Sequence, residues 1–258
     1  MRLVKELWDY REMIISLTRR DLKSRYKGSV LGVLWMFVDP LLQLAVYTIV
    51  FSTIMPMGIE KFYLFLFVAL VPWIFFNVCL SSGTGIILGQ QDMVKKIHFP
   101  REVLPIAFTT GNFVNMLLSF IVIFIVIIFS GIGINPIALL YLPLVMIIEF
   151  MLALGVTLLT SGLTVYFRDL QHIFSVISLA WMYLTPVLYP VESIPEQFRG
   201  LFYLNPMTPV IVAYRDILYY KKSPEWELLS SSAMLALIVM LAGFISFHYL
   251  KRHFAEEL

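Results

Sequence analysis

Residues 103–148 read VLPIAFTTGNFVNMLLSFIVIFIVIIFSGIGINPIALLYLPLVMII, a run of 46 residues that contains no Asp, Glu, Lys or Arg. A helix needs about 20 residues to cross the hydrocarbon core of a bilayer, so this run is too long for one span and long enough for two. Gly131, Gly133 and Asn135-Pro136 lie inside it, and such a group of glycines and a proline favours a tight turn. The stretch therefore predicts two membrane-spanning helices joined by a short turn.

The composition of the whole chain agrees with this prediction. Of its 258 residues 60% are hydrophobic and 14% are charged, whereas an ordinary soluble domain is about one-half apolar and one-quarter charged. Residues 62–91 and 228–250 are also free of charged side chains. We therefore expect an all-α integral membrane protein in which residues 1–258 form one domain. Its six expected spans lie at about 31–54, 63–89, 104–130, 137–165, 173–191 and 229–250.

Lysine and arginine are divided unevenly between the two sides of such a protein. Six spans place both termini on one side, which then holds 14 of the 19 cations: eight before residue 31, and Lys95, Lys96, Arg101, Arg168, Lys251 and Arg252. Cytoplasmic loops carry an excess of Lys and Arg. Both termini, the 90–103 loop and the 166–172 loop are therefore predicted to be cytoplasmic.

Residues 1–29 are expected to form an amphipathic interface helix on the cytoplasmic face. Apolar side chains recur there at spacings of four and three, at Leu3, Leu7, Tyr10, Ile14 and Leu17. Five cations follow where this helix meets the first span: Arg19, Arg20, Lys23, Arg25 and Lys27. They either anchor the chain to anionic membrane lipids or bind the phosphate headgroup of a lipid-linked substrate.

Several classes of function are excluded by features that the sequence lacks. A net charge of +2 is too small to suggest a nucleic-acid partner. Cys79 is the single cysteine, and the four histidines have no spacing typical of a metal site. A nucleotide-binding P-loop places Lys directly after Gly, and none of the nine lysines follows a glycine. We therefore expect no catalytic, cofactor-binding or metal-binding residues in this chain.

Two carboxylates lie inside predicted spans, where an ionisable side chain is costly and usually faces a cavity or a protein partner. Asp39 precedes Pro40 in the first span. It either caps the second half of a kinked helix or lines a pathway. Glu149 lies in the fourth span, and we expect it to face protein rather than lipid.

Aromatic residues are abundant inside the predicted spans and not only at their ends. Most aromatic side chains in a membrane bundle serve packing, but together they would also suit a pathway for sugar rings, which stack on π-systems. Polar groups such as the Asn77 amide would then meet the sugar hydroxyls. The candidate pathway residues are Trp35, Asp39, Tyr47, Trp73, Phe76, Asn77, Trp181 and Tyr183.

Two cytoplasmic segments are candidates for contact with a partner protein. The 90–103 loop has mixed charge and helical propensity as far as Pro100, so it either connects two spans or forms a short docking helix. Its candidate contact residues are Asp92, Lys95, Lys96, His98, Phe99, Arg101 and Glu102, and the second turn adds Arg168 and Asp169.

Residues 192–228 are too polar for a lipid-exposed span yet contain many apolar residues. Pro195 and the Asn205-Pro206 pair favour the starts of two short helices. Such helices form either an amphipathic hairpin on the outer surface or a re-entrant outer gate.

At this point a family resemblance becomes visible. The stretch RDLKSRYKGSVLG at residues 20–32, followed by Leu34-Trp35, resembles the start of polysaccharide and polyol-phosphate ABC exporter permeases. Four further stretches are similar to successive signatures of that family in the same order: residues 71–76 (VPWIFF), 95–101 (KKIHFPR), 166–170 (YFRDL) and 203–207 (YLNPM). The resemblance covers nearly the whole chain.

This resemblance implies a permease that dimerises and pairs with two copies of a separate P-loop subunit, which binds ATP and Mg²⁺. The expected cargo is a lipid-linked polymer of the O-antigen, capsule or teichoic-acid type, exported across a bacterial inner or plasma membrane. The resemblance makes residues 90–103 a coupling helix and residues 192–228 outer gate helices. It also implies that Trp35, Trp73, Phe76 and Tyr183 line the polymer channel.

Other functions are weaker interpretations of the same sequence. Export of small lipids or drugs by an ABC transporter is the closest alternative. An enzyme acting on a polyprenyl-phosphate lipid would need clustered carboxylates or histidines, whereas Asp39 and Glu149 are isolated. A secondary transporter or channel that works alone would be expected to show repeated halves, and none is apparent.

Overall fold

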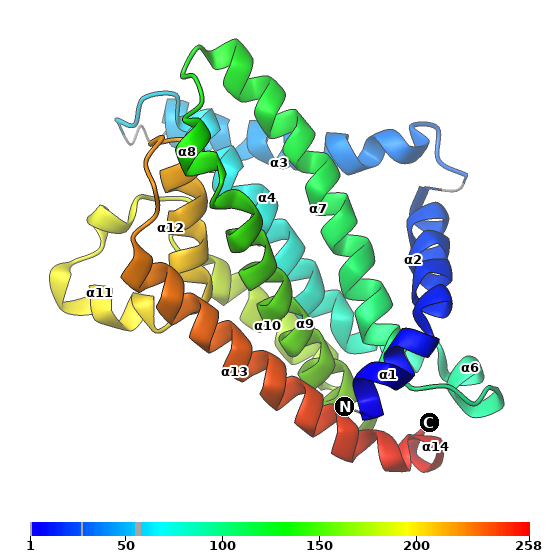
Figure 1. The fold of residues 1–258 in the computed structure, drawn as a ribbon. Coiled ribbons are helices and arrows are strands. Elements are labelled where there is room, and N and C mark those ends of the chain that lie inside the picture. The colour runs from blue at the N-terminus through cyan, green and yellow to red at the C-terminus, as the bar shows by residue number, and fades with distance from the viewer. Residues whose placement is uncertain (1, 27, 55–57) are drawn as a thin grey trace.

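The computed structural model describes residues 2–26, 28–54 and 58–258, and within these ranges the regular elements are all helical (Figure 1). The longer helices are α2 (Arg11–Tyr26), α3 (Trp35–Thr48), α4 (Phe62–Ser81), α7 (Val103–Ser130), α9 (Leu142–Tyr166), α10 (Leu170–Tyr183), α12 (Met207–Leu218) and α13 (Trp226–Leu250). The shorter ones are α1 (Arg2–Asp9), α5 (Ile86–Gly89), α6 (Gln91–Lys96), α8 (Pro136–Leu139), α11 (Glu196–Tyr203) and α14 (Phe254–Glu257). The all-α prediction is confirmed.

Among the described residues, five helical segments are long and apolar enough to cross a membrane: Trp35–Ser52, Phe62–Gly89, Val103–Ser130, Pro136–Tyr166 and Trp226–His253. The run at 103–148 divides as expected, because α7 ends at Ser130 and Gly131 adopts a φ of 71°, which suits glycine. The remaining predicted span, the fifth, corresponds to α10, which has only 14 residues. The count of six spans therefore stays a prediction.

The predicted fifth span at 173–191 extends beyond the helix that the structure contains. α10 ends at Tyr183, and the chain turns through residues 184–189. Pro186 lacks the backbone N–H that a helix interior uses, and its ring disfavours helical backbone at Thr185. The Thr185 hydroxyl donates to the carbonyl of Trp181 at 2.8 Å, which completes the last turn.

α9 and α13 form the most extensive helix–helix contact among the described elements. They cross where Gly155 faces Gly243. A Cβ added at Gly155 would lie 2.6 Å from the Cα of Met240, and one added at Gly243 would lie 2.3 Å from the carbonyl oxygen of Gly155. Membrane helices are held together largely by close packing, which small residues permit. These two glycines therefore set the distance between α9 and α13.

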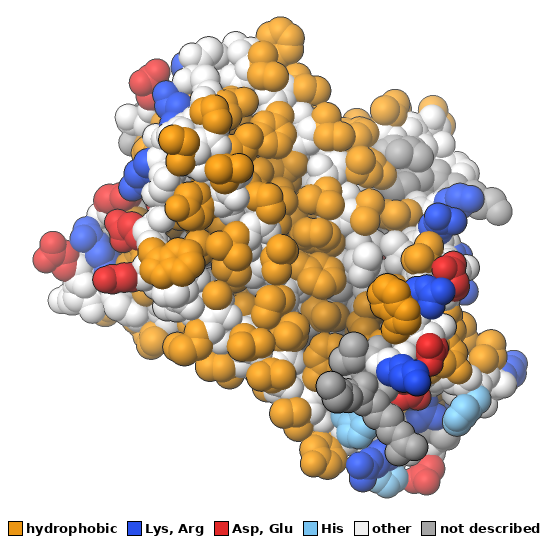
Figure 2. All heavy atoms as spheres, in the orientation of Figure 1, with side chains coloured by type: hydrophobic (Ala, Val, Ile, Leu, Met, Phe, Trp, Pro, Cys, Tyr) orange, Lys and Arg blue, Asp and Glu red, His pale blue; other side chains and the backbone are white. Residues whose placement is uncertain are grey.

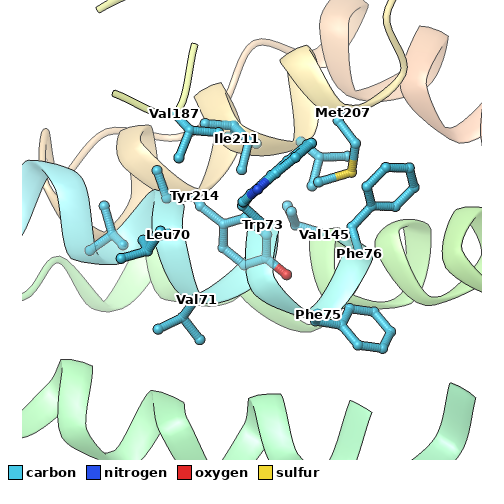
Figure 3. Close-up of a cluster of buried hydrophobic side chains, with 14 of the residues drawn as sticks. Leu70, Val71, Trp73, Phe75, Phe76, Val145, Val187, Met207, Ile211 and Tyr214 are labelled. Atoms are coloured by element: carbon cyan, nitrogen blue, oxygen red, sulfur yellow. The ribbon is translucent and has the colours of Figure 1, made fainter. Parts of the chain in front are cut away.

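α4 is the central helix, and most of its side chains are buried. A helix that is apolar on all sides has no face for water and belongs inside a bundle. Figure 3 shows the Trp73 ring among Val187, Ile211 and Met207, on the side of α4 that faces α12. On the other side, Phe75 contacts Phe113 of α7 with ring centroids 5.7 Å apart.

Both chain ends lie at the same end of the molecule (Figure 1). There Leu7 and Leu17 pack against a buried cluster that also includes Phe247 and Phe254. Figure 2 shows charged side chains gathered at this end and at the opposite end over α11, with a wide apolar surface between them. If that surface lies in a bilayer, both termini lie on one side of it.

The N-terminal amphipathic segment forms two helices, α1 and α2, which meet at Tyr10. Leu7, Tyr10, Ile14 and Leu17 pack against the cluster at the terminal end of the bundle, whereas Trp8 is exposed. α2 then runs beside α7, where the Thr18 hydroxyl donates to the carbonyl of Ala107 at 3.1 Å. The helix expected to lie flat on a membrane is therefore packed against protein for part of its length.

Candidate functional site

A cavity of about 510 Å³ lies between α3, α4 and α7. It brings together two of the candidate pathway residues, Trp35 and Asp39, and adds Gln43 one turn further along α3. Asp39 and Gln43 are exposed, so both polar groups are open to solvent in the isolated chain. The cavity is the place where the predicted pathway residues meet polar groups from other helices.

The opposite wall of this cavity comes from α7, through Asn112, Asn115 and Ser119. The Asn112 amide donates to the carbonyl of Phe108 at 2.9 Å, and the Ser119 hydroxyl lies 3.3 Å from the carbonyl of Met36 on α3. Amide side chains both donate and accept hydrogen bonds, as sugar hydroxyls do. The sequence carried a signal for this wall, because the three positions are spaced by three and four within an otherwise apolar run.

Trp35 stands at one end of the cavity, and its position is fixed by a hydrogen bond. Its indole Nε1 donates to the hydroxyl of Ser29 at 2.7 Å. Since an indole presents a large apolar face and a single donor, the bonded ring keeps that face available to a ligand. Trp35 and Asp39 are therefore the two pathway candidates that share this cavity.

Two other pathway candidates, Trp73 and Phe76, lie in the core and do not line this cavity. Their exposed fractions are 2% and 0%. Their rings contact each other, and Phe76 also contacts Trp181 with centroids 5.4 Å apart. The sequence placed them on α4 correctly but could not say which way they face. In this structure they serve packing.

The remaining pathway candidates are dispersed. The Tyr47 hydroxyl lies 3.9 Å from the sulfur of Met182, and Asn77 is half-buried on α4. Tyr183 is 57% exposed at the end of α10. Trp181 is half-buried, and its indole donates to Asn205 at 2.9 Å. These residues do not join Trp35 and Asp39 around one cavity.

The Asn205 side chain links α10 to the start of α12, because both its amide oxygen and its amide nitrogen form hydrogen bonds. Its oxygen accepts from the Trp181 indole and, at 3.0 Å, from the backbone N–H of Met207 at the start of α12. Its nitrogen donates to the Thr185 hydroxyl at 2.8 Å and to the carbonyl of Leu184 at 3.1 Å. The Asn-Pro start predicted for this helix is present, and its asparagine also holds the turn after α10.

Arg215 on α12 fixes the same turn from the other side and was not singled out from the sequence. Its guanidinium, 3% exposed, donates to the carbonyls of Pro186 at 2.5 Å, Val187 at 2.6 Å and Tyr189 at 3.1 Å. The group also lies 3.6 Å from the centroid of the Phe65 ring. A buried cation is tolerated when its donors are satisfied in this way.

α12 is also attached to the fourth span. Tyr214 donates to a carboxylate oxygen of Glu149 at 2.6 Å, and both side chains are fully buried. Glu149 therefore faces protein, as expected. Eleven of the twelve residues of α12 are buried, whereas the residues of α11 are exposed or half-buried. Of the two predicted gate helices, α12 is part of the core and α11 is the one at the surface.

A second cavity of about 400 Å³ lies at the end of the molecule opposite the termini, beneath α11 and beside α12. Tyr203 and Tyr220 contribute rings to it, and Glu192 and Glu225 contribute exposed carboxylates. Asp216 is buried there and forms an ion pair with Lys222 at 3.2 Å. Burial raises the pKa of Asp216, and Lys222 acts in the opposite direction.

The predicted coupling segment is only partly available to a partner. α6 spans six residues, and Ile97 ends it with extended backbone. Asp92, Lys95, Lys96 and His98 are exposed, with Lys96 and Asp92 paired at 3.1 Å. Arg168 and Asp169 are exposed at the other turn. These side chains form what we call the coupling surface.

Phe99 and Glu102 were predicted to belong to this surface, but they point inward. Phe99 is 8% exposed and joins the buried cluster at the terminal end. Glu102 is 0% exposed and pairs with Lys251 at 2.5 Å, while Arg101 donates to the carbonyl of Lys251. Phe99 is buried among apolar side chains of its own chain and is therefore not exposed to a partner. Phe99, Arg101 and Glu102 therefore anchor the loop to the C-terminal end of α13.

The N-terminal cations lie beside this segment. Arg19, Arg20 and Lys23 are exposed, and Arg20 donates to the side chain of Gln90 at 3.1 Å. Lys27 and the side chain of Arg25 lie outside the part of the chain that the structure describes. The cluster thus lies on the side of the molecule that carries the coupling surface. Within the described residues, groups of three or more His, Cys, Asp or Glu that could hold a metal ion do not occur.

Comparison with known proteins gives a family over most of the chain. The ABC-2 type transporter family matches residues 12–219. The O-antigen export system permease protein RfbA of Myxococcus xanthus is 36% identical over 260 residues, which is 100% of each chain. RfbA of Klebsiella pneumoniae is 30% identical over 96% of this chain and 95% of its own. The polysialic acid transport protein KpsM of Escherichia coli is 22% identical over 88% of this chain and 89% of its own.

Proposed function

This chain belongs to the ABC-2 type transporter family, and from that premise we propose that it is the membrane subunit of an exporter of lipid-linked polysaccharide. The proposed cargo is of the O-antigen or capsule class, as the names of its full-length relatives suggest. The observation that carries the proposal is the agreement between these relatives and the cavity at Trp35 and Asp39. A teichoic-acid-type cargo rests on the sequence resemblance alone.

The polar cavity supports this function through its chemistry. An indole face, two asparagines, a glutamine and a carboxylate line a space of about 510 Å³ beside three apolar helices. Sugar rings stack on aromatic faces and exchange hydrogen bonds with amides and carboxylates. Such groups are costly inside a membrane and are kept where they serve transport. The cavity thus provides one wall of the proposed pathway.

We further propose that two copies of the chain form the pathway together with two copies of a separate ATP-binding subunit. The segment Trp35–Ser52 supports dimerisation, because its own chain buries only 11% of it, against 78% for Phe62–Gly89. A face of α10 is similarly exposed, at Ile173, Val176, Ile177 and Leu179. The lack of a P-loop lysine in the sequence supports a separate source of ATP hydrolysis.

The proposed location is the bacterial inner membrane, with both termini and the coupling surface in the cytoplasm. The shared position of the two termini and the excess of cations at that end support this orientation (Figure 2). The coupling surface would then face the ATP-binding subunit, and α11 would lie on the outer side.

The proposed function is tested in cells that make a lipid-linked polysaccharide but lack this chain and its ATP-binding subunit. We expect surface display of the polymer to return only when both proteins are expressed, because this chain provides the pathway and its partner the energy. Surface polymer is measured with an antibody on intact cells, and polymer retained inside is measured after lysis. Display driven by this chain alone would contradict the proposal.

The coupling surface is tested by reversing exposed charges. In the variant with Lys95→Glu and His98→Glu, we expect export to fall about tenfold while the amount of folded permease stays unchanged, because both side chains are exposed. Export and ATP hydrolysis by the purified complex are measured together. Glu227→Lys, an exposed charge reversal at the opposite end, is the matched control and should leave export unchanged. Full export by the double variant would exclude this surface from coupling.

A further inference from the structure

We propose that Asp39 makes the pathway selective for uncharged glycans over polyanionic ones. This inference rests on the proposed function, since it assigns a substrate class to the same cavity. Among the described residues that line the cavity, Asp39 is the ionisable one, and its partners there are amides, hydroxyls and apolar side chains. A phosphate or uronate passing this point meets a carboxylate with the same sign of charge.

The position of Asp39 makes that repulsion effective. Its side chain is exposed on α3, which lies in the candidate span that its own chain covers least, so the carboxylate faces the space that a polymer would occupy. Apolar walls of α4, including Val71 and Phe75, border the same cavity. Charges that interact near low-dielectric walls are screened less than charges in bulk water. If two copies of the chain form the pathway, each acidic group of the cargo passes two such carboxylates.

The described cations at the end of the molecule opposite the termini are each bonded to the chain's own oxygens, although Lys221 and Lys222 remain exposed. Lys61 donates to the carbonyl of Ser130 at 2.9 Å, and Lys221 donates to that of Ile132 at 2.9 Å. Arg199 donates to the carbonyls of Ile194 and Glu192. These cations are shared with the protein's own carbonyls, and none of the described ones lies among the residues that line the cavity at Asp39.

The cavity beneath α11 also contains both acidic and basic side chains. Its two cations are committed, Arg215 to backbone carbonyls and Lys222 to Asp216. The carboxylates of Glu192 and Glu225 are exposed around it. This cavity therefore presents two exposed carboxylates and one lysine that is already paired, whereas Asp39 is the ionisable group among the described residues of the first cavity.

A group of exposed cations lies at the other end, at Arg19, Arg20 and Lys23. Such groups attract phosphate, which suits the single lipid-linked phosphate end of a polymer at the cytoplasmic mouth. The pathway would thus recognise charge at two separate positions, with cations at the cytoplasmic mouth and the Asp39 carboxylate in the cavity. Phosphate is favoured at the mouth and disfavoured further in, so a chain with one charged end and neutral repeats fits better than one charged at every repeat.

The test compares two lipid-linked polymers of equal length, one neutral and one with a uronic acid in each repeat, exported by the complex with its ATP-binding subunit. We expect the wild-type complex to export the neutral polymer about tenfold faster. In Asp39→Asn, which keeps the shape and removes the charge, the acidic polymer should be exported faster and the ratio should fall to about two. Asp39→Ser gives the same charge change with a different side chain.

Glu227→Gln removes one exposed carboxylate far from the cavity and should leave the wild-type ratio unchanged. Equal export of both polymers by the wild type would overturn the proposal, whatever the variants do. An unchanged ratio in both Asp39 variants would overturn the role of this residue. A complex that exports neither polymer contradicts the proposed function itself, which distinguishes the two failures.

Discussion

Gly155→Ala is expected to reduce the amount of folded protein strongly. Among the described glycines, only Gly243→Ala is expected to have an effect as large. The Cβ added at Gly155 would lie 2.6 Å from both the N and the Cα of Met240, well inside van der Waals contact. Backbone atoms cannot move aside as a flexible side chain can, so α9 and α13 would have to separate. We expect a loss of about 3 kcal/mol or more in stability, at the upper end of the range for overpacking.

The measurement is the fraction of detergent-solubilised protein that elutes as a single species in size-exclusion chromatography, together with its thermal midpoint. Gly200→Ala is the matched control, because a Cβ there meets nothing within 4 Å and the residue also lies in a helix. That control should match or slightly exceed the wild type, since alanine favours helices. A wild-type midpoint for Gly155→Ala would show that the two helices are not packed as closely as described.

The membrane character of the chain was predictable because it depends on composition over long windows. The uncharged runs indicated long apolar helices, five of which the described residues contain, and the glycines at 131 and 133 marked the turn between α7 and α9. The Gly155 crossing was not predictable in the same way. A glycine in an apolar run looks alike whether it faces lipid or another backbone, and only the partner helix distinguishes the two.

Some of the candidate site residues line the cavity, and others lie in the core. Asp39 was predicted because an ionisable side chain inside a span usually faces a cavity or a partner, and Trp35 because aromatic rings inside spans would suit sugar rings. Trp73 and Phe76 were predicted by the same rule of residue type, yet they lie in the core. α4 is apolar on all sides, so its sequence has no periodicity from which the facing of a side chain could be inferred. The polar side of α7 at Asn112, Asn115 and Ser119 does have that periodicity.

In the coupling segment, the sequence indicated the exposed residues but not a contact with a distant part of the chain. Charge and a nearby proline correctly indicated a polar loop that interrupts two spans, and its exposed cations lie where a partner could reach them. Glu102 was assigned to the same surface because a carboxylate in a loop is usually solvated. Its ion pair with Lys251 joins positions 149 residues apart, a distance over which sequence patterns carry no information about contact.

Arg215 is the clearest case of a long-range contact that decides local structure. The turn after α10 follows from Pro186 locally, but its shape depends on a guanidinium almost 30 residues later in the chain. Asn205 holds the same turn through Thr185 and Leu184. Together Arg215 and Asn205 hold the turn after α10 in one conformation. A conformational change at this end of the molecule would therefore have to involve α11, whose residues are less buried.

Arg215→Met is therefore expected to abolish export while leaving the chain inserted in the membrane. Methionine has a similar length but no donors, so the carbonyls of Pro186, Val187 and Tyr189 would lose their partner. Each buried polar group left without a partner costs about 1 to 3 kcal/mol, so the turn should open rather than keep its shape. We expect export to fall at least about tenfold and protease cleavage within residues 184–206 to increase.

Arg199→Met is the matched control, since Arg199 also donates to two backbone carbonyls but is partly exposed, so water can replace it. Its export should stay within about twofold of the wild type. Arg215→Lys keeps the charge without the planar fork and should fall between the two, because an ammonium group cannot reach three carbonyls in this geometry equally well. If Arg215→Met exported normally and resisted protease, the turn would have to be held by Asn205 and Pro186 alone, and the guanidinium would have no role in shaping the outer end.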